Sequence, residues 1–213
     1  MSDRFIIVDA EQRSEAWYAA RAGRLTGSVA SAMMAKVKSG EAAGRRNLRA
    51  KLVLERVTGK PQEDDFLSRD MQRGIDLEPE AFGEFEAITG VILQRTGFLV
   101  MGDDYGCSLD AHLGDFDELV SIKCLNDANH MAYVLGGKRI PKDHIEQCRH
   151  ELWVTGAKRH HFLSYNPNFP PKLRAFYVTM ERSEFDIDEY EREAIKFMAE
   201  VRDEAEKLMR LAA

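Results

Sequence analysis

The chain has 213 residues, of which 44% are hydrophobic and 31% charged, as is typical of a globular protein with a sizeable core. No segment is long and apolar enough to predict a membrane-spanning helix, and the first residues lack the basic start and apolar run of a signal peptide. The three cysteines are odd in number and not at metal-ligand spacing, so we expect reduced thiols. We therefore expect a cytoplasmic protein without a membrane partner, folded as a single domain over residues 1–213.

Charge is distributed unevenly along the chain. Residues 1–60 carry 12 Lys+Arg and 6 Asp+Glu, a net +6, whereas the remainder carries 18 and 30, a net −12. The total of −6 argues weakly against a nucleic-acid partner, but the asymmetry fits a basic binding surface beside an acidic metal site. Charged residues that are spread unevenly over the surface without a function explain the same counts, and on charge alone this is the favoured interpretation.

The first elements predicted in chain order are helical. Ser14 caps a first helix, which ends before the break at residues 24–28. A second helical stretch follows, so the hydroxyls of Thr26 and Ser28 stand before a helix, where backbone N–H groups can bind an anion. Arg21 lies one turn upstream. A simple helix cap is the more economical interpretation of the break taken alone.

Residues 45–58 predict a further helix, whose apolar side contains Leu48 and Leu52. Arg45 and Arg49 are among the basic residues on its surface. Such a charged helix face is usually just solvated, but its position after the break at residues 24–28 makes contact with DNA an equally supported interpretation.

The spacing of Leu77, Ala81 and Phe85 predicts a helix over residues 69–89. Glu78 lies beside this apolar stripe and can therefore point toward the edge of the core, although an acid in that position is usually solvated. Residues 91–101 predict a strand, and residues 105–110 and 118–124 predict two more, joined by a turn at Gly114–Asp115.

The second half of the chain alternates between helical and extended patterns. Gln147 and Glu151 share one face of a helical segment at i, i+4 spacing. The whole order predicts an α/β (α+β) fold with a mixed central β-sheet flanked by helices. The later elements expected are helices over 127–135, 145–156 and 186–211 and strands over 160–165 and 174–180.

The segment from Asp110 to Lys123 carries the chemistry. Strand alternation places Ser121 and Lys123 on one face of the strand over residues 118–124. A lysine in a buried strand needs an acid or an anion nearby, and Asp110 on the neighbouring strand is the candidate. Carboxylates that hold a divalent ion, with a lysine beside them to orient water and offset charge, are suited to phosphodiester hydrolysis. The bare pattern is short and common by chance.

Several motifs in consistent order make the pattern more specific, and together they resemble the phage lambda-type exonucleases, viral recombination nucleases of the PD-(D/E)xK superfamily. The resemblance spans nearly the whole chain and implies a restriction-endonuclease-like core. The motifs are Trp17 with Arg21, Gly23, Thr26 and Ser28; Glu78 within Gly74–Ala81; Cys107-Ser108-Leu109-Asp110; Lys123-Cys124; and Gln147 with Trp153-Val154-Thr155.

The resemblance implies a role for each matched position. Asp110 would be a shared metal ligand, Glu78 would support the metal site, and the Ile122 carbonyl would face the metal. Lys123 would act on the attacking water, and Gln147 would position that water or the scissile phosphate. The cofactor implied is Mg²⁺, with Mn²⁺ as a substitute and two ions in the active form. The residues implied at the 5′-phosphate are Arg21, Ser28 and Ser108, with Thr26 beside them.

The resemblance also implies an activity and partners. Such enzymes digest one strand of linear double-stranded DNA from a 5′-phosphorylated end and leave a 3′ overhang for recombination. They work beside a single-strand annealing recombinase, and the lambda type forms a homotrimer around DNA. A phage or prophage protein in the cytoplasm of a bacterial host is therefore expected.

Ser121 departs from the family pattern, which places a metal-binding glutamate two residues before the lysine. Asp117 lies about 13 Å away along the strand, and Glu118 points to the opposite face, so neither is a good replacement. The chain is therefore expected to be impaired, whether the serine is natural or engineered. We expect Ser121→Glu to restore strong cleavage.

Two other functions compete with the exonuclease. The first is a catalytically inactive DNA-end-binding module that recruits the annealing protein. The second is an unrelated small-molecule enzyme with a histidine metal site. His160 and His161 are neighbours on a strand, so their rings should point in opposite directions and chelate poorly.

Overall fold

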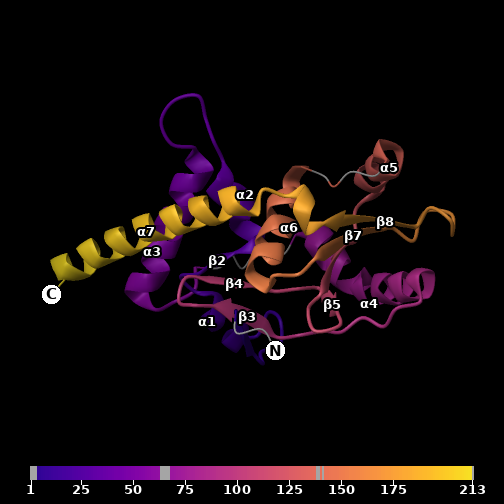
Figure 1. Ribbon diagram of the computed structural model, residues 1–213, viewed down its shortest axis with the longest axis horizontal. Coiled ribbons are helices and arrows are strands. Elements are labelled where there is room, and N and C mark those ends of the chain that lie inside the picture. The colour runs from indigo at the N-terminus through magenta and orange to yellow at the C-terminus, as the bar shows by residue number, and fades with distance from the viewer. Residues whose placement is uncertain (1–3, 63–67, 138–139, 141, 213) are drawn as a thin grey trace.

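The computed structural model of the protein describes residues 4–62, 68–137, 140 and 142–212. Within these residues the strands form two four-stranded sheets, ordered β1-β3-β4-β2 and β5-β6-β7-β8, with helices packed around them (Figure 1). The strands are β1 (Ile6–Val8), β2 (Leu25–Thr26), β3 (Phe98–Met101), β4 (Tyr105–Cys107), β5 (Ala111–Leu113), β6 (Glu118–Lys123), β7 (Arg159–Tyr165) and β8 (Ala175–Glu181).

Both sheets are mixed, which confirms the predicted α/β class. In the first sheet β2 runs parallel to β4 while β1, β3 and β4 are antiparallel, and in the second β6 runs parallel to β7 between antiparallel neighbours. The prediction of a single central sheet is replaced by two sheets that meet where the chain passes from β4 to β5.

The helices begin and end largely where the sequence predicts. Ser14 caps α1, Ser68 caps α4 and Asn126 caps α5, each accepting a backbone N–H through its side-chain oxygen. Gly59 ends α3 with a left-handed φ of 66°, which costs a glycine little. The helices are α1 (Glu15–Arg21), α2 (Ala30–Met34), α3 (Ala43–Thr58), α4 (Arg69–Thr89), α5 (Asp127–Gly136), α6 (Lys142–Thr155) and α7 (Ile187–Ala212), with 3₁₀ turns η1 (Gly27–Val29) and η2 (Arg182–Glu184).

Two predicted strands are shorter than the apolar patterns suggest. Of the strand expected over 91–101, only Phe98–Met101 forms, because before it the chain meets strand backbone only at the single bridge between Gln94 and His112. The strand expected over 105–110 ends at Cys107, and the chain re-enters the other sheet as β5. Asp110 therefore lies in the break between the two sheets and not on a strand.

Helix α6 packs across this break, against β4, β6 and β7. Its buried residues Leu152 and Trp153 belong to the largest apolar cluster, which also contains residues of α3 and α7. A direct contact joins α6 to β4, because the Gly106 carbonyl accepts a hydrogen bond of 2.8 Å from Nε2 of His150. The break and its side chains are thus held by a rigid helix.

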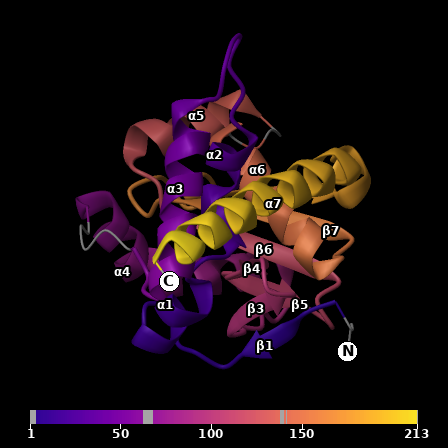
Figure 2. The ribbon, with the colours of Figure 1, turned by 90° about the vertical axis from the view of Figure 1, so that its left-hand side faces the viewer.

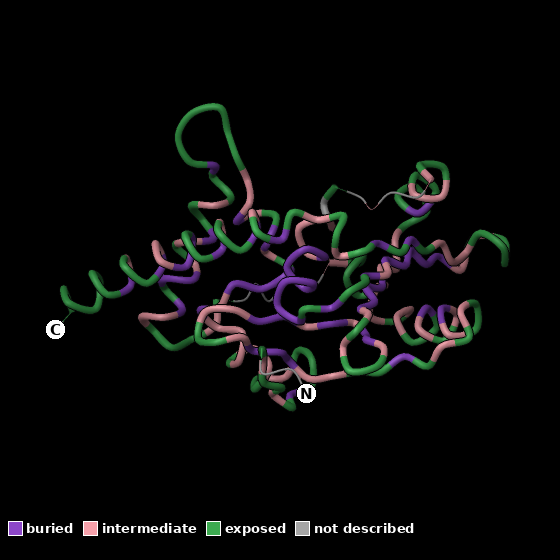
Figure 3. The backbone as a smooth tube through the Cα atoms, in the orientation of Figure 1, coloured by how far each residue is buried: buried purple, intermediate pink, exposed green. Residues whose placement is uncertain are grey.

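Helix α7 lies against α3, and its last turns extend beyond the body of the molecule (Figures 1 and 2). Ile187, Tyr190, Met198 and Val201 are buried, whereas Ile195, Leu208 and Leu211 are exposed. Figure 3 shows that the C-terminal end of α7 is exposed. None of the described helices has the length and hydropathy required to cross a bilayer.

Candidate active site

Asp110 is fixed by a backbone contact at the end of the β5–β6 pairing. This pairing begins at Ala111 opposite Val120, so within the described part of the chain β6 has no strand neighbour on that edge from Ser121 onward. The Oδ2 atom of Asp110 accepts the free N–H of Ile122 at 2.7 Å. Because the N–H and C=O of one residue face the same edge of a strand, the Ile122 carbonyl lies on the edge that faces Asp110.

Lys123 lies next to this carboxylate. Its Nζ atom is 3.8 Å from Oδ2 of Asp110, and its side chain is 24% exposed. Burial by itself would lower the pKa of Lys123, but the carboxylates of Asp110 and Glu151 raise it above its ordinary value. The pairing predicted from the sequence is confirmed, and Lys123 is an ammonium group at neutral pH.

Glu78 reaches the same place from α4. Asp110, Ile122, Lys123 and Glu78 line one cavity of about 380 Å³, together with residues from the loop before α1 and the start of α5. Oε1 of Glu78 is 3.1 Å from Nη1 of Arg95, whose side chain is 57% exposed. Arg95 follows the apolar run at 91–93 and was not singled out from the sequence.

A buried polar cluster lies on the α6 side of β6. The Ser121 hydroxyl donates to Oε2 of Glu151 at 3.2 Å, and the Gln147 amide donates to Oε1 of Glu151 at 2.8 Å. Nε2 of His160 lies 2.7 Å from Oε2 of the same carboxylate. Glu151 is 2% exposed. Sequence reasoning placed Glu151 beside Gln147 but gave it no role, although this spacing was the signal for it.

Glu151 and His160 form a charged pair. Burial by itself would raise the pKa of Glu151, but hydrogen bonds from His160 and Gln147 and the Lys123 charge lower it. Burial would likewise lower the pKa of His160, but Cys148 and Glu151 raise it to about 10. A carboxylate that stays ionised therefore lies directly beside the serine at position 121.

The residues predicted at the 5′-phosphate also come together. Nη2 of Arg21 donates to Ser28 Oγ at 3.2 Å, and Thr26 Oγ1 lies 3.3 Å from the same oxygen. The Arg21 guanidinium stacks over the Trp17 ring at 4.1 Å, and Trp17 Nε1 donates to Ser108 Oγ at 2.9 Å. Arg21, Thr26 and Ser28 are thus in direct contact, and Ser108 is joined to them through the Trp17 side chain.

The segment that follows Thr26 differs from the expectation of a helix N-terminus. Residues Gly27–Val29 form only a 3₁₀ turn, and α2 has five residues, so no long helix points at the anion. The turn instead packs on α6: a Cβ on Gly27 would lie 3.3 Å from Gln147 Cγ and 3.4 Å from Glu151 Oε1. Hydroxyls and a guanidinium thus remain as the donors, adjacent to the cluster around Glu151.

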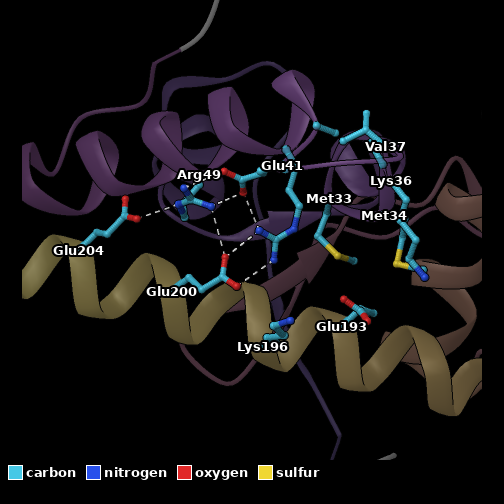
Figure 4. Close-up of a pocket in the computed structure, with 14 residues that line it drawn as sticks. Met33, Met34, Lys36, Val37, Glu41, Arg49, Glu193, Lys196, Glu200 and Glu204 are labelled. Atoms are coloured by element: carbon cyan, nitrogen blue, oxygen red, sulfur yellow. Dashed lines mark hydrogen bonds and ion pairs between the residues drawn. The ribbon is translucent and has the colours of Figure 1, made fainter.

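Arg45 and Arg49 lie elsewhere, at the interface of α3 and α7 (Figure 4). Arg45 pairs with Glu41 and Glu200, each at 2.7 Å. Arg49 pairs with Glu41 and with Glu200, and its Nε lies 2.9 Å from Glu204. Figure 4 shows Glu41, Glu200 and Glu204 pointing toward the Arg49 side chain. Both arginines therefore hold two helices together, which favours a structural role for this helix face over contact with DNA.

The histidines are engaged in separate contacts. His160 points toward Glu151 and His161 toward Glu118, so the predicted divergence of their rings is confirmed. His130 contacts Ser164, while His112 stacks on a phenylalanine ring. Among the described residues no three His, Cys, Asp or Glu side chains converge as a metal-binding group.

The oxygen donors around the cavity nevertheless fit a hard divalent cation. Mg²⁺ prefers carboxylate and carbonyl oxygens and keeps several waters, so one or two carboxylates are enough to hold it. Asp110, Glu78 and the backbone of Ile122 offer such donors at one cavity. Lys123 at its edge is a cation that would have to share Asp110 with the ion.

Comparisons with known proteins identify the family of the chain. Residues 16–158 match the model of the YqaJ-like viral recombinase domain. The crystal structure of an alkaline exonuclease from Laribacter hongkongensis superposes with a TM-score of 0.84 at 33% identity, covering 93% of this chain and 98% of that one. The same exonuclease in complex with dAMP matches equally well.

A more distant structure shares the fold. A phage-related exonuclease from Haemophilus somnus 129PT has a TM-score of 0.71 at 11% identity, covering 89% of this chain and 96% of that one. The comparison with curated proteins gave no match. The family match covers more than half of the chain, and with it the cavity of Asp110 and Lys123 and the cluster around Arg21. The chain belongs to the YqaJ-like viral recombinase family and is a nuclease of the phage lambda exonuclease type.

Proposed function

We propose that the protein is a Mg²⁺-dependent 5′→3′ exonuclease that acts on the ends of linear double-stranded DNA and leaves a 3′ single-stranded overhang for recombination. The observation that supports this most is the cavity shared by Asp110, Glu78 and Lys123. Carboxylate oxygens beside a positive charge are the groups that metal-dependent phosphodiester hydrolysis requires, which supports the proposal.

Asp110, Glu78 and the Ile122 carbonyl are the residues that would hold the ion, and a second ion would complete the active form. When bound, Mg²⁺ or Mn²⁺ supplies Lewis-acid stabilisation of the phosphate and makes a bound water more acidic. The donor set is oxygen only, as these ions prefer.

Lys123 would stabilise charge on the phosphate, and Gln147 would orient the attacking water. Because Lys123 is protonated, its ammonium donates hydrogen bonds and offsets the charge that develops on the phosphate oxygens. The Gln147 amide nitrogen donates to Glu151 at 2.8 Å, which leaves its amide oxygen to accept a hydrogen bond from the attacking water.

The cluster around Arg21 would select the 5′-phosphorylated end of the DNA. Arg21, Ser28 and Ser108, with Thr26 beside them, would hold the 5′-phosphate while the next phosphodiester lies at the cavity. Water then attacks the phosphorus and the bond to the 3′ oxygen breaks. A 5′-mononucleotide with a 3′ hydroxyl leaves, and the following nucleotide carries a new 5′-phosphate. The Laribacter enzyme was crystallised in complex with dAMP, which is a 5′-mononucleotide.

The proposal includes two kinds of partner. A closed homotrimer around DNA would keep the enzyme on its substrate between cuts, and a single-strand annealing recombinase would receive the overhang. Light scattering of the purified protein measures the first, and co-purification with the annealing protein measures the second.

End-labelled duplexes test the polarity. We expect a 5′-labelled blunt duplex to lose its label as mononucleotide at once, and a 3′-labelled strand to shorten progressively from its other end. A closed circular duplex is the matched control and should remain intact. Release of the 3′ label first, or cutting of the circle, would contradict the proposal.

A DNA-end-binding module without catalysis is the second candidate. The observation that favours it is Ser121, which leaves the position two residues before Lys123 without a carboxylate. Tight binding of duplex ends without any nucleotide release, in Mg²⁺ and in Mn²⁺, would establish this alternative.

A further inference from the structure

Position 121 lacks a carboxylate, but a carboxylate from another element lies beside it. The side chain of residue 121 points at α6, and its Oγ atom lies 3.2 Å from Oε2 of Glu151. A glutamate at position 121 would extend in the same direction, so its carboxylate would enter the volume that the Glu151 carboxylate occupies. Both residues are 2% exposed, which leaves little freedom for either side chain to turn elsewhere.

Glu151 also contacts the residues assigned to the reaction. Its Oε1 atom accepts from Gln147 at 2.8 Å, and its negative charge acts on Lys123 together with that of Asp110. Lys123 therefore has one carboxylate on the side of the cavity and another on the side of α6. Gly27, next to the proposed 5′-phosphate site, approaches the same Oε1 atom.

We propose that Glu151 supplies from α6 the catalytic-site carboxylate that the family carries at position 121, and that this carboxylate contributes to holding the divalent ion. The proposal rests on the proposed function, because it concerns the same ion. It replaces the expectation that Ser121 disables the chain: the charge is retained and has moved from a strand to the facing helix.

A purely structural role for Glu151 makes a different prediction. As a counter-charge for His160, it would affect folding and leave metal affinity unchanged. As the relocated carboxylate, it would be replaceable by a glutamate placed at position 121, since only the position of the charge matters. Moving the charge back therefore separates the two roles.

The experiment measures Mn²⁺ binding to the full chain from the loss of the free-ion electron paramagnetic resonance signal, with no DNA present. Four proteins are compared: the unchanged chain, Glu151→Gln, the double variant Ser121→Glu/Glu151→Ser, and Glu146→Gln as a matched loss of a carboxylate on α6. We expect Glu151→Gln to weaken Mn²⁺ binding about 10- to 100-fold. The double variant should return to within about threefold of the unchanged chain, and Glu146→Gln should not differ from it.

Mn²⁺ affinity that is equal in Glu151→Gln and the unchanged chain would overturn the proposal, as would a folded double variant that binds as weakly as Glu151→Gln. Circular dichroism checks each fold, and if Glu151→Gln does not fold, the double variant decides. If the unchanged chain degrades DNA while Glu151→Gln keeps its Mn²⁺ affinity, only this inference fails. If the unchanged chain neither binds Mn²⁺ nor degrades DNA, the proposed function fails with it.

Discussion

The indole nitrogen of Trp17 donates a hydrogen bond of 2.9 Å to the Ser108 hydroxyl, although the two residues are 91 positions apart. This contact joins the helical start of the chain to the turn that leads into Asp110. Trp17 also supports the Arg21 guanidinium at 4.1 Å from its ring. One aromatic side chain thus aligns the proposed 5′-phosphate site with the proposed cleavage site.

Removal of Arg21 should change the preference for the DNA end. We expect Arg21→Ala to lose about tenfold in kcat/KM on a 5′-phosphorylated duplex, because a charged hydrogen bond contributes about 1.5–3 kcal/mol. A 5′-hydroxyl duplex should lose far less. Steady-state kinetics on both ends measure this, with Arg192→Ala on α7 as a control for loss of one exposed charge. Equal losses on both ends would count against the phosphate role.

Removal of Arg49 should affect stability and not DNA binding. Its guanidinium pairs with Glu41, Glu200 and Glu204 between α3 and α7. We expect Arg49→Ala to lower the free energy of unfolding by about 1 kcal/mol, as for a partly exposed ion-pair network. Urea denaturation measures this, and fluorescence anisotropy with a duplex end should show unchanged affinity. Weakened DNA binding at unchanged stability would show that α3 contacts DNA.

Tyr190 should limit stability at high pH. Burial raises the pKa of Tyr190 well above its ordinary value of 10, so its contribution is complete below pH 10 and is lost as pH rises through the folded-state pKa. Burial also lowers the pKa of His150 to about 4, so this ring is neutral and its Nδ1 accepts from the Tyr190 hydroxyl at 2.7 Å.

The variant that tests this is Tyr190→Phe. It leaves Nδ1 of His150 unpaired, so we expect about 1–3 kcal/mol less stability at pH 8. Above pH 10 its unfolding free energy should fall less steeply than that of the unchanged chain, because the titrating hydroxyl is gone. Denaturation curves from pH 8 to 11 measure both effects. Parallel curves over this range would show that Tyr190 does not govern the alkaline limit.

Ser121→Glu alone should no longer be expected to restore the site. Glu151 already lies 3.2 Å from Ser121 Oγ, so a second carboxylate there would be buried beside an ionised one. In EDTA we expect the unfolding free energy to fall by about 3 kcal/mol, as for an uncompensated buried charge. Thermal melts with and without EDTA measure this. A variant as stable as the unchanged chain, with faster cleavage, would show that the site lacks a carboxylate.

Much of the fold follows from local sequence signals. Ser14 and Gly59 mark helix ends through capping chemistry that acts within one turn. The alternation in residues 118–123 correctly separates Leu119 from Val120, which belong to different apolar clusters. It also places Lys123 opposite Asp110. These features need only the chain's own periodicity.

Other features depend on partners far away in the sequence. Residues 91–97 have a strand's composition, but apart from one bridge they meet no strand edge, and Ile92 is 82% exposed. Arg45 and Arg49 have the composition of a DNA-binding surface, yet two of the acids that pair with them, Glu200 and Glu204, lie on α7. The sequence pattern of its own helix predicted no role for Glu151. Its role depends on contact with Ser121, which lies 30 residues earlier on a strand. Such pairings become visible only in the folded chain.

The most direct test of the account is the rate at which the unchanged chain releases 5′-mononucleotides from a 5′-phosphorylated linear duplex in Mg²⁺, compared with Asp110→Asn. The asparagine oxygen can still accept the Ile122 N–H, so the fold should persist while the charge is lost. The account predicts rapid release by the unchanged chain, abolished by EDTA and reduced at least 100-fold in Asp110→Asn, a change of about 2.7 kcal/mol in activation free energy. Equal release by both proteins, or release that persists in EDTA, would contradict it.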